Sequence, residues 1–367
     1  MEQIWLLIPG LVLLLAGGEW LVRGASRLAL RLGIPRVIIG LSLVAFGTSA
    51  PELAVSVLSS YQGKSGIAVG NVVGSNIVNI LLILGLSAAV MPVAVSKRII
   101  RIEVPIMVGT ALLFLLLAYD GHLSRADGVV LVVIFIAYIA WMARTARSDP
   151  SLEAELPDGN GGSGGGWAVY LRLLVLVVAG LAGLILGSRW LIDGAVALAR
   201  MLGVSELIIG LTLVAAGTSL PELVTSVIAS IRGERDIAVG NAVGSNIFNI
   251  LSVLGFSTVV SPEGLQVASS IIRFDAPVMI AVSVACFPIF FNGFQIKRWE
   301  GILFSVYYVF YVVYLYLNAS KHVALDEYTF VMRWFVLPFV ALTLVTILLL
   351  AWRQHVWLPR RSTQKVR

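Results

Sequence analysis

The sequence predicts an all-α polytopic membrane protein: two inverted-topology five-helix repeats, which form a ten-helix core, and one extra transmembrane helix at the carboxyl end. Three observations predict this fold class. Hydrophobic residues make up 59% of the 367-residue chain and charged residues 13%, and the mean hydropathy is +0.95. Many segments are apolar over the roughly 20 residues that a helix needs to cross the hydrocarbon core. The segment Gly40 to Gly85 recurs as Gly210 to Gly255 without an insertion.

The repeated segment contains two motifs that keep the same spacing in both copies. The motif Gly-Thr-Ser-x-Pro-Glu ends at Glu52 and at Glu222, and Gly-Ser-Asn-Ile-x-Asn ends at Asn79 and at Asn249. A constant offset of 170 residues relates the two copies of each motif. About two thirds of the paired positions across the segment are identical, which indicates a duplicated structural unit.

Apolar segments bounded by glycine, proline and charged residues predict eleven helices. The first half is expected to contain five, over residues 4–30, 36–61, 66–91, 98–119 and 125–145. The second half is expected to contain five more, over residues 168–200, 206–231, 236–260, 272–294 and 299–318. An eleventh helix, over residues 330–352, has no partner in the repeat.

This pattern divides the chain into four regions. Residues 1–147 form the first repeat and residues 167–318 the second. The segment between them, 148–166, is rich in glycine, serine and proline, which predicts a flexible cytoplasmic linker. Residues 319–367 contain the extra helix and a basic cytoplasmic tail.

Lys and Arg residues gather at one end of the expected helices, and such an excess marks cytoplasmic loops. The clusters lie at Arg31 and Arg36; Lys97, Arg98 and Arg101; Arg144 and Arg147; Arg232 and Arg235; Lys297 and Arg298; and between Arg353 and Arg367. They share one side if the amino terminus is outside and the carboxyl terminus is cytoplasmic. Five helices separate each motif from its copy, and because five is odd the copies have opposite orientations. Inverted repeats build transporters whose substrate sites lie near the bilayer midplane, between the repeats.

The remaining composition excludes several classes of function. The net charge of +6 comes largely from these helix-end residues, so nucleic-acid binding is not expected. Cys286 is the single cysteine, which rules out an internal disulfide, and the three histidines lie near helix ends. Met1 opens a segment without the basic region of a cleaved secretory signal, so we expect the first helix to be retained. The short linker suggests the plasma (inner) membrane of a prokaryote.

Two carboxylates within apolar segments carry the functional prediction. Glu52 and Glu222 occupy equivalent positions of the repeat, and an ionisable residue inside a membrane segment is costly and marks a functional site. Pro51 and Pro221 lack a backbone N–H, so each helix is expected to be disturbed about one turn earlier. Backbone carbonyl oxygens freed there, including that of Ala45, could then become ligands.

Hydroxyl and amide side chains accompany each carboxylate. Thr48 and Ser49 lie one helical turn before Glu52, and Ser75 and Asn79 are four residues apart on the next helix. The second repeat has the same arrangement. The resulting set of ligands is all oxygen, which suits Ca²⁺ with its roughly 6–8 oxygen ligands, whereas the absence of Cys and His argues against zinc or copper. Four further asparagines are expected to bond backbone groups outside this set: Asn71, Asn76, Asn241 and Asn246.

At these motifs the chain closely resembles the calcium/cation antiporter superfamily, specifically the prokaryotic sodium/calcium exchangers. The resemblance implies ion ligands at Ala45 (through its carbonyl), Thr48, Ser49, Glu52, Ser75 and Asn79, and at their counterparts Ala215, Thr218, Ser219, Glu222, Ser245 and Asn249. It also implies that Ca²⁺ and Na⁺ occupy overlapping sites in turn, while the first and sixth helices slide across the rest. Some relatives carry an acid at the position of Asn79 or Asn249. Asparagine at both positions leaves two carboxylates and makes potassium co-transport less expected.

The function expected is secondary active antiport of Na⁺ against Ca²⁺ by alternating access. Ca²⁺ and Na⁺ are the expected substrates and membrane lipid the surroundings; no cofactor, nucleic acid or protein partner is expected. The nearest alternative is a Ca²⁺/H⁺ antiporter that protonates the same glutamates. A passive cation channel and an intramembrane hydrolase with the carboxylates as acid and base rank lower. No water-activating motif supports the hydrolase, so the protein is not expected to be an enzyme.

Overall fold

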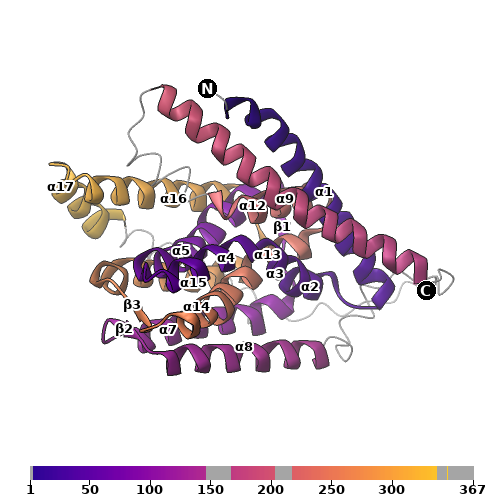
Figure 1. Cartoon of the computed structure of the whole chain (residues 1–367), viewed down its shortest axis with the longest axis horizontal. Helices are drawn as coiled ribbons and strands as arrows, with labels where there is room; N and C mark the ends of the chain where they lie inside the picture. The colour runs from indigo at the N-terminus through magenta and orange to yellow at the C-terminus, as the bar shows by residue number, and fades with distance from the viewer. Residues whose placement is uncertain (1–2, 146–166, 203–216, 337–344, 346–367) are drawn as a thin grey trace, which may run out of the picture.

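The structure is a computed structural model that describes residues 3–145, 167–202, 217–336 and 345. Within these residues, eight helices are long and apolar enough to cross a membrane, or nine when one bent pair counts as a single span. Figure 1 shows them as one layered helical bundle. The expected linker and most of the expected eleventh helix lie outside the described residues. The expected helix over 206–231 is described only from Gly217 onward.

The helices follow the expected order, and most ends agree to within a few residues. The first half contains η1 (Ile4–Leu6), α1 (Leu7–Leu32), α2 (Arg36–Ile39), η2 (Gly40–Val44), α3 (Ala45–Thr48), α4 (Ala50–Tyr61), α5 (Ser65–Val78), η3 (Asn79–Leu84), α6 (Gly85–Val90), η4 (Ile99–Glu103), α7 (Val104–Leu117) and α8 (Arg125–Thr145). The second half contains α9 (Trp167–Met201), α12 (Leu220–Ile231), α13 (Arg235–Phe248), η7 (Asn249–Leu254), α14 (Gly255–Val260), η8 (Ile271–Asp275), α15 (Ala276–Phe291) and α16 (Arg298–Ala319). The segments α17 (Leu325–Val331) and η9 (Met332–Val336) follow.

The long helices α1 and α9 lie side by side (Figure 1), and glycines of both helices line a seam where their backbones meet. A Cβ atom on Gly17 would lie 2.6 Å from the backbone nitrogen of Leu184, and one on Gly180 would lie 2.5 Å from that of Leu21. Real Cβ atoms do not approach backbone this closely, so only glycine permits the contact. Small residues that let two backbones touch are typical of helix pairs in membranes. We conclude that α1 and α9 form one closely packed unit.

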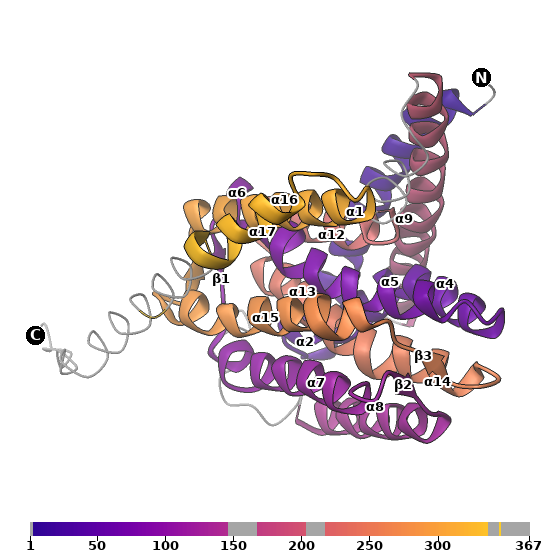
Figure 2. The same ribbon diagram turned by 90° about the vertical axis from the view of Figure 1, so that its left-hand side faces the viewer.

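Two short antiparallel strand pairs join the halves. Strand β1 (Val93–Ala94) pairs with β4 (Gln295–Ile296), and β2 (His122–Leu123) pairs with β3 (Leu265–Gln266). Each pair links a loop of one half to a loop of the other. Figure 2 places β1 and the β2–β3 pair at opposite ends of the bundle.

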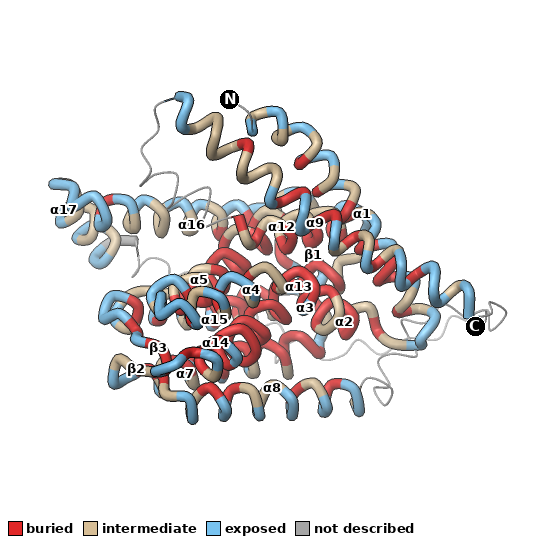
Figure 3. The backbone as a smooth tube through the Cα atoms, in the orientation of Figure 1, coloured by how far each residue is buried: buried red, intermediate tan, exposed pale blue. Residues whose placement is uncertain are grey.

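The centre of the bundle is formed by the helices that carry the second repeated motif. Every residue of α13 from Ile237 to Phe248 is buried, and most of α5 from Ala68 onward is buried as well. Figure 3 shows these helices enclosed, with α8 and α16 at the outside. The outer helices expose large apolar side chains, such as Ile136 and Ile302, that suit contact with lipid. The polar residues of the second motif are therefore buried inside the bundle.

Candidate cation site

The break predicted from the first proline is present. The segments Arg36–Thr48 and Ala50–Tyr61 meet at an angle of 45° at Ser49. Pro51 then lies in the first turn of α4, where a missing N–H has no intrahelical partner to lose. In the second repeat Pro221 has the same place in α12. Both glutamates follow directly, so each lies in the first turn of a helix that begins deep inside the protein.

Backbone carbonyl oxygens shortly before Ser219 and Ser49 already have hydrogen-bond partners. The Gly217 carbonyl accepts a hydrogen bond of 2.8 Å from the Ser188 hydroxyl on α9. The Ala45 carbonyl accepts the Ser49 N–H at 3.0 Å, so the expectation that the break frees this oxygen is wrong. Oγ1 of Thr48 also lies 3.3 Å from this oxygen, so a cation bound there would take the place of the Thr48 contact. Ala215, the equivalent of Ala45, lies outside the described residues.

The two glutamates are buried and bonded across the repeats. Glu52 and Glu222 are each 1% exposed. The Ser219 hydroxyl donates to Oε1 of Glu52 at 3.0 Å, and the Ser49 hydroxyl donates to Oε1 of Glu222 at 3.0 Å. Each carboxylate is therefore held by a serine of the opposite half. The Oε2 atoms of both have no hydrogen-bond partner among the described residues.

Further oxygen acceptors in the motifs are also buried and unpartnered. Within the described part of the chain, Oδ1 of Asn79, Oδ1 of Asn249 and Oγ of Ser245 find no hydrogen-bond partner. Oγ of Ser75 lies 3.3 Å from Oγ of Ser219; because Ser219 gives its one hydrogen to Glu52, the Ser75 hydroxyl is the donor of this pair. A buried acceptor without a partner costs about 1–3 kcal/mol, and more if it is charged. A cation bound among these oxygens would remove that penalty, and carboxylate, amide and hydroxyl oxygens are ligands that hard cations prefer.

The two threonines contact asparagines of the opposite half. Oγ1 of Thr48 lies 3.0 Å from Oδ1 of Asn241, and Oγ1 of Thr218 lies 3.3 Å from Oδ1 of Asn71. Asn71 and Asn241 donate in turn to the main-chain carbonyls of the two glutamates, each at 3.3 Å. The prediction that these asparagines bond backbone groups is confirmed. Their contacts with the threonines were missed, although asparagine at equivalent positions of both copies was a visible signal.

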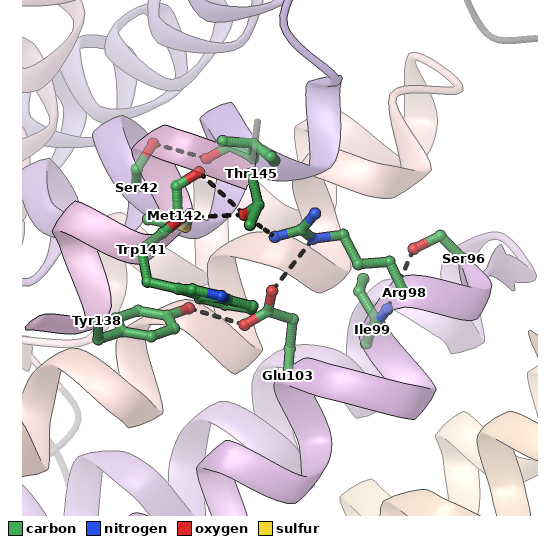
Figure 4. A network of polar contacts seen from close by, with 10 residues as sticks. Ser42, Ser96, Arg98, Ile99, Glu103, Tyr138, Trp141, Met142 and Thr145 are labelled. Carbon is green, nitrogen blue, oxygen red and sulfur yellow. Dashed lines mark hydrogen bonds and ion pairs between the residues drawn. The ribbon is translucent and has the colours of Figure 1, made fainter. Parts of the chain in front are cut away.

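Glu103 provides a contrast with the two site glutamates. It lies near the start of a membrane-spanning helix, and its side chain is completely buried within the protein. Arg98 Nε approaches its Oε1 at 3.3 Å, and the Tyr138 hydroxyl donates to its Oε2 at 2.8 Å (Figure 4). Arg98 also lies 5.6 Å from the ring centroid of Trp141. With both oxygens bonded and a cation beside it, Glu103 has no need of a metal ion.

Transition-metal chemistry finds no support in the part of the chain that the structure describes. No group of three or more His, Cys, Asp and Glu side chains there could hold a metal ion. The sequence-predicted site is instead made of neutral oxygens and two carboxylates. A helical membrane protein with two inverted repeats and buried, unpartnered oxygens on both defines a class, the secondary transporters of cations.

Comparison with known proteins identifies the family. The family description "Sodium/calcium exchanger protein" matches residues 2–144 and 172–317. The chain is 39% identical to the putative antiporter CaxA of Alkalimonas amylolytica, over 86% of this chain and 98% of that protein. It is 36% identical to the sodium/calcium exchanger MaX1 of Methanosarcina acetivorans, over 85% and 97%. A solved structure of the sodium-calcium exchanger NCX_Mj is similar with a TM-score of 0.73 and 32% identity, over 85% of this chain and 98% of that one.

The chain belongs to the sodium/calcium exchanger family. It is an integral membrane protein and a cation antiporter of the sodium/calcium exchanger type, and its relatives are transporters rather than enzymes. The resemblance and the fold class predicted from the two motifs are confirmed.

Proposed function

We propose that this protein exchanges Na⁺ for Ca²⁺ by alternating access, with the ions bound near the midplane between the repeats. One observation carries the proposal. Glu52 and Glu222 come from opposite halves, are buried together with serines of the opposite half, and keep an unpartnered oxygen each. Carboxylates in this position are costly unless a cation joins them.

The proposed ion ligands are the twelve residues expected from the motifs. Eleven are described, and Ala215 is carried over by its place in the repeat. The proposed ligands are Ala45, Thr48, Ser49, Glu52, Ser75, Asn79, Ala215, Thr218, Ser219, Glu222, Ser245 and Asn249. Two ionised glutamates balance one Ca²⁺ or two Na⁺, and a third Na⁺ would leave one surplus positive charge.

The conformational change is proposed to involve α1 and α9. Their glycine seam brings backbone against backbone, so we propose that they move as one body relative to the helices that carry the ligands. The amino terminus is placed outside and the carboxyl terminus in the cytoplasm, in a prokaryotic inner membrane, because the Lys and Arg clusters share one side in this orientation. The proposed division into residues 1–147, 148–166, 167–318 and 319–367 follows the repeat.

A Ca²⁺/H⁺ antiporter is the second candidate. The unpartnered Oε2 atoms of the two glutamates could take up protons when Ca²⁺ leaves, which would also remove the buried charge. Under this mechanism a proton gradient would drive Ca²⁺ uptake without Na⁺.

Radiolabelled Ca²⁺ uptake into proteoliposomes separates the two candidates. Vesicles preloaded with Na⁺ are compared with vesicles that contain K⁺, that carry a proton gradient, or that have no gradient. Sodium/calcium exchange predicts uptake only with internal Na⁺, and loss of that uptake in Glu52→Gln. Glu327→Gln, on the exposed segment after α16, is the matched control and is expected to keep wild-type uptake. Uptake without internal Na⁺ in the proton-gradient vesicles would reject sodium coupling.

A further inference from the structure

Two asparagines at the centre of the bundle bind each other's backbone. Asn76 lies on α5 and Asn246 on α13, and each is 1% exposed. Nδ2 of Asn76 donates to the main-chain carbonyl of residue 246 at 3.3 Å, and Nδ2 of Asn246 donates to the main-chain carbonyl of residue 76 at 3.1 Å. Each Nδ2 also has a methionine sulfur, a weak acceptor, within reach: Met279 at 3.5 Å and Met107 at 3.6 Å.

These contacts determine which way both amides point. A side-chain amide has nearly the same shape when its oxygen and nitrogen are exchanged, so only its hydrogen-bond partners select the orientation. A main-chain carbonyl can only accept a hydrogen bond. The NH₂ groups of Asn76 and Asn246 must therefore face the carbonyls, and their Oδ1 atoms must point the other way.

The orientation passes on to two proposed ion ligands. Oδ1 of Asn76 accepts from Nδ2 of Asn249 at 3.0 Å, and Oδ1 of Asn246 accepts from Nδ2 of Asn79 at 2.9 Å. Because Nδ2 of Asn79 and of Asn249 is used in these hydrogen bonds, the Oδ1 atom of each side chain must point away from them. These are two of the buried atoms without a hydrogen-bond partner among the described residues.

We propose that Asn76 and Asn246 are positioning residues that make Asn249 and Asn79 present oxygen, and not NH₂, to the transported cation. Each acts on the ligand of the opposite repeat, so both halves must be assembled before either amide is oriented. A flipped ligand amide would point its positive end at the cation. The inference rests on the proposed function, because it requires Asn79 and Asn249 to be ligands.

A double-mutant cycle distinguishes this positioning role from a purely structural one, in which Asn76 only stabilises the contact between the two repeats. Asn76→Ala removes the acceptor that orients Asn249, and Asn249→Asp replaces the amide with a carboxylate whose two oxygens are equivalent. A carboxylate has no wrong orientation. If Asn76 orients Asn249, Asn76→Ala is expected to weaken Ca²⁺ binding at least about fivefold when residue 249 is the natural Asn. This is the effect expected from the loss of one or more hydrogen bonds. In the Asn249→Asp background, Asn76→Ala is expected not to weaken Ca²⁺ binding.

The readout is Ca²⁺ binding by isothermal titration calorimetry on the purified full-length protein, together with the KM and maximal rate of uptake. The exposed Asn318→Ala is the amide control. An equal loss of Ca²⁺ affinity in both backgrounds would overturn the proposal and show that Asn76 has only a structural role. The mirror cycle, Asn246→Ala with Asn79→Asp, gives an independent answer if Asn76→Ala does not fold. Failure of the proposed function would be recognised separately, as wild-type Ca²⁺ binding without Na⁺-dependent uptake.

Discussion

The serines that bond the glutamates across the repeats provide a quantitative prediction. Ser219→Ala removes the 3.0 Å hydrogen bond to Oε1 of Glu52 and leaves that buried oxygen without this donor. Hydrogen bonds to charged groups contribute about 1.5–3 kcal/mol. Because Ser219 is also a proposed ligand, a bound cation loses one oxygen together with the hydrogen bond that orients Glu52. With this bond as the scale, and 1.4 kcal/mol corresponding to a factor of ten, Ca²⁺ affinity is expected to fall by about 10- to 150-fold. Ser49→Ala is expected to have a similar effect, because its bond to Glu222 has the same length.

The assay is the Ca²⁺ dependence of Na⁺-driven uptake, with Ser283→Ala as control. Ser283 is also a buried serine, but its hydroxyl donates to the carbonyl of Met279 on its own helix, at 2.7 Å. This control is expected to change KM less than about twofold, because the bond it loses is local and neutral. A KM for Ser219→Ala equal to that of the control would refute the reasoning that the hydroxyl prepares the carboxylate for the ion.

Two further predictions concern stability. Gly180→Leu places side-chain atoms where the backbone of α1 lies, so the yield of folded protein and its melting temperature are expected to fall. Gly66→Ala is the control, because a Cβ there meets no atom within 4 Å, and it is expected to keep the wild-type yield and melting temperature. An unchanged melting temperature for Gly180→Leu would argue against the seam. Arg98→Ala leaves the Glu103 carboxylate buried without the guanidinium that pairs with it, and is expected to cost about 3–5 kcal/mol of stability. The melting temperature should fall, whereas the Ca²⁺ affinity of the folded protein should stay within about twofold of wild type. A large change in affinity would mean that this pair acts on the ion site.

Local features of the fold were accessible from the sequence because they depend on neighbouring residues. The apolar segment expected at 125–145 is α8, Arg125–Thr145, and Pro51 predicted a break that occurs at Ser49. The repeat itself indicated that the two copies would have the same local structure, because about two thirds of their paired positions are identical. The odd number of helices between the two copies then predicted that they have opposite orientations, and the similarity to NCX_Mj agrees with this inversion.

Contacts between segments far apart in the chain could not be predicted in this way. The hydrogen bond between Tyr138 and Glu103 joins two different helices, and no local pattern in the sequence shows that pairing. The contacts of Asn76 with Asn246 depend on how the two copies face each other across the bundle. Which acceptors are left unpartnered is likewise a property of the assembled halves, so the sequence identified the ligand types but not the hydrogen bonds that orient them.

The central claim is that Na⁺ and Ca²⁺ cross the membrane in opposite directions through the site of the two glutamates. Simultaneous measurement of radiolabelled Na⁺ efflux and Ca²⁺ uptake in the same proteoliposomes tests it most directly. The account predicts that external Ca²⁺ accelerates Na⁺ efflux, that the two fluxes keep a constant ratio, and that both disappear in Glu52→Gln and in Glu222→Gln. Ca²⁺ uptake without Na⁺ efflux, or coupled fluxes that survive in both variants, would contradict it.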